Sequence, residues 1–241
     1  MVIAQSRLAE LPEPAQRGID TLAKKLHELA GPAALSLTVF GAAATGRFEP
    51  SRSAVRSVAV LARDDLFLLR NLSVSASSLG RLGLLAPLVI TPEFLQRSLD
   101  TFPLELLEIQ QEHVVVFGED HFAPLEFQPQ HVRLQCEREL KVQQISLARG
   151  VLMAAGKEER LAHVGVTLAE GLLRVFRGIL WLRGEPPVHQ PFQLVSALET
   201  ILGRTLPGVC QALDHANLAH WHKFENLHAD LIVLGEFVDA L

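Results

Sequence analysis

The spacing of apolar residues predicts that the first half of the chain mixes helices and strands. In the stretch "RGIDTLAKKLHELAG", apolar residues recur at steps of three and four, as they do along one face of a helix. These residues are Ile19, Leu22, Leu26 and Leu29. Gly31 and Pro32 follow directly and predict that this helix ends there.

Short apolar runs bounded by turn-forming residues predict strands. The runs are "LSLTVF", "VRSVAVL", "APLVIT" and "EHVVVFG". We assign "FPLELLEIQ" to a further strand, with a helix as the alternative. Thr91 followed by Pro92 predicts a helix start, with the threonine as N-cap and the proline at the first helical position.

The second half of the chain shows almost only helical spacing. Four apolar stripes are expected to face a common core, as in a bundle of four or five helices. They are Leu140, Leu147, Val151 and Ala154; Leu161, Val164, Leu168, Leu172, Val175 and Ile179; Phe192, Val195, Leu198 and Leu202; and Leu227, Leu231, Leu234 and Val238. The segment "FAPLEFQPQ" carries two prolines, so we predict an α/β domain over residues 1–130 and a helical bundle over 131–241.

Composition indicates a globular protein of the cytoplasm. Apolar residues make up 49% of the 241 residues, and no apolar run is long enough to span a bilayer. The N-terminus lacks the pattern of a signal peptide, and the two cysteines, Cys136 and Cys210, suit a reducing compartment as unpaired, buried thiols. The net charge of −5 argues against a nucleic-acid-binding protein.

Charge is distributed unevenly along the chain. Residues 41–90 contain six arginines against three acidic residues. The arginines are Arg47, Arg52, Arg56, Arg63, Arg70 and Arg81. Two interpretations stay open at this point, namely ordinary surface arginines or a local site for an anion.

The order of motifs in the first half resembles the nucleotidyltransferase superfamily of the DNA polymerase beta type. A strand leads to "GAAATG", a loop follows, and a second strand begins at "RSAVRSVAVL". The segments "ITPEFLQRSLDTFPLELLEI" and "VVVFGED" are similar to those of small bacterial members of that superfamily. The resemblance covers about residues 15–125. It implies a mixed sheet with flanking helices, followed by a helical bundle, which is an α+β fold.

Active members of that superfamily bind two Mg²⁺ ions about 3.5–4 Å apart. The resemblance implies a glycine-serine turn, two acids one residue apart on the next strand, and a third acid on a later strand. In this chain the serine is replaced by Ala42, and the two acids fall on Ala54 and Arg56. The third acid has a counterpart in Glu105, for which a solvent-facing structural role is the alternative. We therefore expect no resident metal or other cofactor and a degenerate catalytic site.

The residues of this turn and loop are candidates for binding a phosphate or a nucleotide without metal. An arginine offers a planar fork of donors that suits phosphate oxygens. The candidates are Gly41, Ala42, Gly46, Arg47, Arg52 and Arg56. The alternative for Arg56 is an ion pair with Glu105 or another acid.

Three functions stay open from the sequence. The first is a catalytically degenerate binding or regulatory module. The second is an active Mg²⁺-dependent transferase whose acids the alignment does not place. The third is an interaction module that acts through the helical bundle, with a homodimer or another protein as partner. The histidines His215, His220, His222 and His228 lack the spacing of a metal site on a helix.

Overall fold

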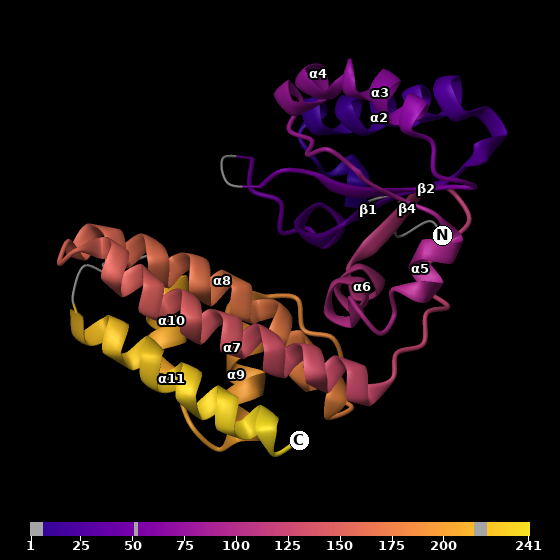
Figure 1. Ribbon diagram of the computed structural model, residues 1–241. Coiled ribbons are helices and arrows are strands. Elements are labelled where there is room, and N and C mark those ends of the chain that lie inside the picture. Colours follow the sequence, from indigo (N-terminus) through magenta and orange to yellow (C-terminus); the bar gives the residue numbers. More distant parts are fainter. Residues whose placement is uncertain (1–6, 51–52, 215–220) are drawn as a thin grey trace. The chain divides into compact units, whose positions relative to one another are not determined.

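The computed structural model describes residues 7–50, 53–214 and 221–241 and has an α+β fold (Figure 1). The chain divides into two compact units, one of residues 1–99 and 108–126 and one of residues 100–107 and 127–241. One division falls within helix α6 (Pro103–Gln111). From the sequence we expected one boundary near residue 130. In the structure, residues 100–107 also belong to the helical unit.

The first unit is built on a mixed sheet of four strands within the described residues. The strand order is β3-β2-β1-β4, in which β1 pairs antiparallel with both β2 and β4, and β2 pairs parallel with β3. The strands are β1 (Ala34–Phe40), β2 (Arg56–Leu61), β3 (Leu88–Ile90) and β4 (His113–Gly118). All four were predicted from the sequence.

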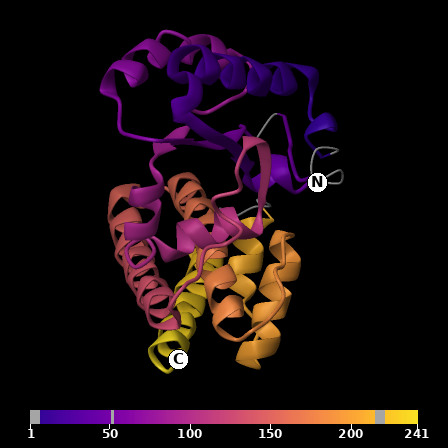
Figure 2. The same cartoon turned by 90° about the vertical axis from the view of Figure 1, so that its right-hand side faces the viewer.

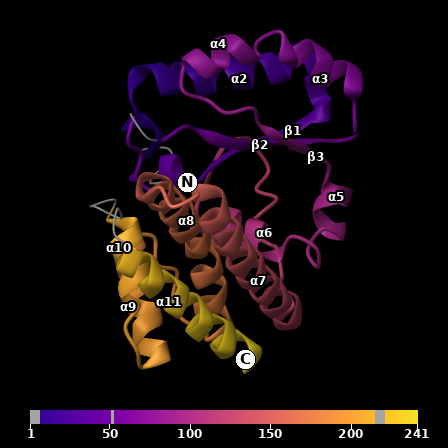
Figure 3. The ribbon, with the colours of Figure 1, turned by 60° about the vertical axis from the view of Figure 1, so that its left-hand side comes forward.

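Helices α2 (Glu13–Ala30), α3 (Leu66–Ser73) and α4 (Ala76–Arg81) cover one face of this sheet (Figures 2 and 3). Leu22 and Leu26 of α2 pack in one buried cluster with Leu37 and Val39 of β1. Alternate residues of a strand point to opposite faces, so these two β1 residues face the same helices. The predicted α2 stripe is buried except for Leu29, whose exposed fraction is 38%.

Helix α5 (Pro92–Arg97) begins as the sequence predicts. The Thr91 side chain accepts a hydrogen bond from the Phe94 N–H at 3.1 Å. The strand expected over "FPLELLEIQ" is wrong, because this segment forms α6. Leu107 and Glu108 follow Leu104 by three and four residues, and all three are buried. This spacing places them on one face of a helix.

Besides the first residues of α6, the second unit contains five complete helices among its described residues, and these five lie side by side as a bundle (Figures 1 and 2). They are α7 (Pro129–Ala154), α8 (Glu158–Leu182), α9 (Pro191–Leu202), α10 (Pro207–Leu213) and α11 (Trp221–Asp239). Most residues of the four predicted stripes are buried, and those of α11 are all fully buried. Phe192 is an exception, with an exposed fraction of 51%.

Cys136 and Cys210 are both free, as expected, but Cys210 is only half-buried. Burial raises the pKa of the Cys136 thiol to about 12, so this thiol is a core group rather than a nucleophile.

Among the described residues, no helix has the length and apolar character needed to cross a membrane.

The close contact between α10 and α11 depends on Gly208. A Cβ atom at this position would lie 2.1 Å from the backbone nitrogen of Leu227. We predict that Gly208→Ala lowers the free energy of unfolding by about 2–3 kcal/mol, because the backbone of α11 must move away. Urea denaturation followed by circular dichroism measures this change.

The matched control is Gly80→Ala in α4, where no atom lies within 4 Å of the added Cβ. Alanine favours a helix over glycine, so this variant should be as stable as the wild type or more stable. A Gly208→Ala variant as stable as the Gly80→Ala variant would show that the helix contact is not close.

Candidate functional site

The turn after β1 carries the residues that the resemblance implies for phosphate binding. A 3-10 turn over Gly41–Ala44 follows Phe40 directly. Gly41 and Gly46 have φ values of 75° and 72°, in the left-handed region that favours glycine. The Gly41 N–H donates a hydrogen bond to the Glu112 carbonyl oxygen at 2.8 Å. The first N–H of the turn is therefore bonded to the protein itself.

Arg47 follows this turn in the chain and forms an ion pair with a buried carboxylate. Its Nη2 lies 2.7 Å from Oε2 of Glu112, and its Nε donates to Oγ1 of Thr45 at 2.9 Å. Only 1% of the Glu112 side chain and 16% of the Arg47 side chain are exposed. Such a pair loses most of its contact with water, so each charge depends on the other.

Arg56 begins β2 beside the same turn. Its Nη1 lies 3.1 Å from Oε1 of Glu108, and its guanidinium lies 4.3 Å from the centre of the Phe40 ring. Phe40 and Arg56 are opposite one another in the antiparallel register. A Cβ atom on Gly41 would lie 3.5 Å from Nη1 of Arg56, so this guanidinium adjoins the turn. The sequence left an ion pair with an acid as the alternative role of Arg56, and the structure contains such a pair, with Glu108 as the acid.

Glu108 lies in the last turn of α6, and Glu112 directly follows the helix. Glu108 and Glu112 are four residues apart, and the Glu112 N–H donates to the Glu108 carbonyl at 3.0 Å, as in a continuing helix. This spacing places both side chains on one face. These two acids were missed from the sequence because Glu108 and Glu112 were assigned to two separate strands, "FPLELLEIQ" and "EHVVVFG", rather than to one helical segment.

Glu105 has a different environment from the one expected. It lies in the first turn of α6 rather than on a strand, and it belongs to the second unit. It accepts hydrogen bonds from Nε2 of Gln135 at 2.7 Å and from Nη1 of Arg174 at 3.0 Å. Gln135 in turn accepts from the Leu104 N–H at 2.7 Å. Glu105 therefore connects the start of α6 to α7 and α8.

The other predicted site residues fall into two groups. Ala42 lies within the turn, and Ala54 lies just before β2, where neither offers a side-chain ligand to a metal ion. Arg52 lies outside the described residues, as do His215 and His220. His222 and His228 are exposed on α11. In the part of the chain that the structure describes, no three histidine, cysteine or acidic side chains are grouped closely enough to hold a metal ion.

A histidine and an aspartate lie at the same end of the sheet, because His113 begins β4 and pairs with Phe40. Its Nε2 lies 3.0 Å from Oδ2 of Asp120. Burial favours a higher pKa for Asp120, but hydrogen bonds from the Ala123 and Phe122 N–H groups and from His113 outweigh it and lower the pKa. This pair orders the loop that follows β4.

The chain matches no protein-family model, and no curated protein is similar to it in sequence. The resemblance to nucleotidyltransferases therefore stays a prediction that depends on the order of motifs. The geometry adds one observation that does not depend on any relative. At the end of β1, Arg47 forms an ion pair with Glu112, and Arg56 forms one with Glu108.

We predict that Glu112→Gln lowers the free energy of unfolding by about 3 kcal/mol, because it leaves the Arg47 charge buried without a counter-charge. The double variant Glu112→Gln with Arg47→Met should recover part of this loss. Chemical denaturation of the two single variants and the double variant measures the coupling between the two residues.

The control is Glu93→Gln in α5, whose ion pair with Arg97 is 71% exposed at the glutamate. An exposed pair contributes about 0–1 kcal/mol, so this variant should stay close to the wild type. Equal effects of Glu112→Gln and Glu93→Gln would contradict the importance of the buried pair.

Proposed function

We propose that the chain is a catalytically inactive relative of the nucleotidyltransferases and acts as a binding or regulatory module. The support is the order of strand, glycine turn, loop and strand, together with the residues found at the turn. The free thiols fit a place in the cytoplasm. An active metal-dependent transferase is the alternative that the first experiment below excludes or establishes.

The observation that carries this proposal is the pairing of Arg56 with Glu108. Magnesium binds oxygen ligands, and a transferase needs carboxylates that are available to two metal ions. Here Arg56 occupies the position that the resemblance assigns to one acid. Its guanidinium lies 3.1 Å from the Glu108 carboxylate. A divalent cation at this place would be repelled by the guanidinium and would compete with it for the carboxylate.

The same geometry supports a metal-independent site for phosphate. The Arg56 side chain is 38% exposed, whereas that of Arg47 is 16% exposed. One Nη1 contact to Glu108 leaves several of the five guanidinium donors of Arg56 for a second anion. Arg56 is therefore the residue that a phosphate group would reach, with Arg47 adding positive potential behind it. Glu108 lowers the affinity of such a site, because it competes with the ligand for the same guanidinium.

We predict that the purified protein transfers no nucleotide to an acceptor. The expected result with labelled nucleoside triphosphates, Mg²⁺ or Mn²⁺ and candidate protein acceptors is a rate no higher than that of the reaction without protein. Transfer that follows the protein through a second purification step would establish the active alternative.

We predict that ATP binds in the presence of EDTA and that Arg56→Ala weakens this binding. A hydrogen bond to a charged group contributes about 1.5–3 kcal/mol, which corresponds to a loss of affinity of roughly 10–150-fold. Glu108→Gln should strengthen binding, because the amide no longer competes for the guanidinium. Isothermal titration calorimetry measures all three proteins.

Arg97→Ala is the control, because Arg97 is an exposed arginine on α5 with a glutamate partner. It should bind ATP as the wild type does. If the wild type fails to bind ATP, or if Arg56→Ala and Arg97→Ala bind equally well, Arg56 is a structural residue and the phosphate site is refuted.

A further inference from the structure

Helix α7 presents a regular stripe of apolar and basic residues to solvent. Three apolar residues on it have exposed fractions of 57%, 60% and 79%. The stripe recurs at steps of three and four, the spacing of one helix face. In order, it comprises Leu134, Arg138, Lys141, Ile145, Arg149 and Leu152. We call this set the basic stripe.

Helix α11 presents a stripe of the same length and spacing but of opposite charge. Its two large apolar residues have exposed fractions of 46% and 42%. The stripe comprises Trp221, Glu225, His228, Ile232, Glu236 and Asp239. We call this set the acidic stripe. With histidine neutral, it carries three negative charges, and the basic stripe carries three positive charges.

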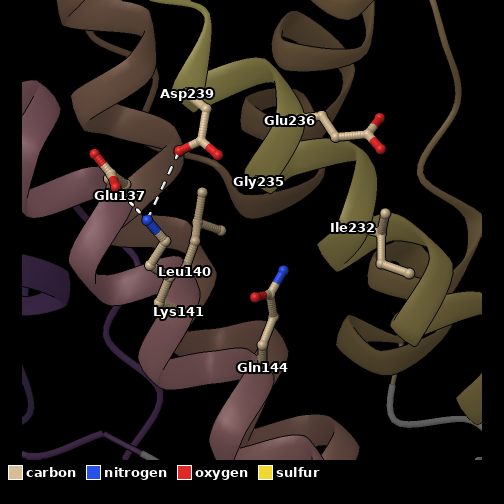
Figure 4. Close-up of a pocket in the computed structure, with 8 residues that line it drawn as sticks. All are labelled: Glu137, Leu140, Lys141, Gln144, Ile232, Gly235, Glu236 and Asp239. Carbon is tan, nitrogen blue, oxygen red and sulfur yellow. Dashed lines mark hydrogen bonds and ion pairs between the residues drawn. The ribbon is translucent and has the colours of Figure 1, made fainter.

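The two stripes border one groove between antiparallel helices (Figures 1 and 4). Lys141 lies 3.9 Å from Asp239, and Nε2 of Gln144 donates to the Leu231 carbonyl at 3.3 Å. Lys141, Ile232, Glu236 and Asp239 all line this groove. Both stripes therefore belong to one surface, with the basic stripe along one side and the acidic stripe along the other. Glu137 of α7 also lines the groove and forms an ion pair with Lys141.

We propose that this surface binds a second copy of the chain about a twofold axis, with the basic stripe of each copy on the acidic stripe of the other. A partner that covers both stripes must offer acids opposite α7 and bases opposite α11. The chain itself carries this pattern. A twofold axis parallel to the helices preserves their antiparallel order, so each basic stripe meets the other copy's acidic stripe in the opposite direction.

The sequence of side chains along the two stripes matches in this arrangement. When the basic stripe of one copy runs antiparallel to the acidic stripe of the other, its Arg138 lies level with the acids near the end of the other copy's α11. Its Ile145 then lies level with Ile232 of the other copy. Arg149 then approaches Glu225. Neither Arg138 nor Arg149 forms an ion pair with a residue that the structure describes, so both charges are available to the second copy. Burial of the exposed apolar residues supplies the main driving force.

Sedimentation equilibrium of the full chain tests this dimer. The wild type should sediment with twice its chain mass of 26.5 kDa. The pair Arg138→Glu with Arg149→Glu should weaken association at least ~100-fold, and so should the pair Glu225→Arg with Glu236→Arg, because each brings like charges together. An equimolar mixture of the two double variants should form a heterodimer, because each reversed stripe then meets its complement.

Arg160→Glu and Glu170→Arg, two exposed positions on α8, serve as charge-reversal controls and should leave the mass unchanged. Circular dichroism establishes that each variant is folded. A salt series on the wild type needs no variant: a dimer that weakens between about 0.05 M and 0.5 M salt supports the proposal. A wild type that stays at 26.5 kDa at about 100 µM overturns the proposal. A dimer that withstands salt and both double reversals overturns it as well.

Discussion

A carboxylate that is removed from water needs a positive charge or several hydrogen-bond donors close to it, and Glu112 imposes this constraint on the first unit. Only 1% of its side chain is exposed. Arg47 supplies the charge, and the Gly41 N–H binds the Glu112 carbonyl. Glu108, one helical turn earlier, is matched by Arg56 in the same way. The glycine turn, the start of β2 and the end of α6 are therefore held together by charge.

This arrangement determines which chemistry the end of β1 can support. A metal-dependent transferase uses the carboxylates of its site as metal ligands. Here the nearby carboxylates are paired with arginines, and Arg56 also lies over the Phe40 ring. The partly exposed guanidinium of Arg56 is then the chemical group that a ligand would meet first, which favours an anion over a cation.

The sequence predicted most elements of the fold because their signals are local. The apolar spacing of α11 places Leu227, Leu231 and Leu234 on one face, and all are fully buried. The Thr91 cap depends only on the next three residues. The spacing could not show that Phe192 lies at the surface, because a stripe shows which side of a helix is apolar but not how far the neighbouring helices cover its first turn.

The candidate site was less predictable, since its contacts join distant parts of the chain. Arg47 and Glu112 are separated by 65 residues, and Arg56 and Glu108 by 52. The charged residues near the turn were visible in the sequence, but their partners depend on α6. Because "FPLELLEIQ" contains several apolar residues in a short run, it was assigned to a strand. Glu108 and Glu112 were then expected on two separate strands, so their i, i+4 relation was not recognised.

Because Arg47 and Arg56 pair with the carboxylates at the end of β1, we expect that no divalent cation binds there. Titration of the isotope-labelled protein with Mn²⁺, without nucleotide, tests this expectation. Bound Mn²⁺ broadens the amide signals of neighbouring residues in a nitrogen–proton correlation spectrum. We expect the signals of Gly41 to Thr45 and of Arg56 to keep their intensity relative to the rest of the chain. Selective loss of these signals at low Mn²⁺ concentration would contradict it.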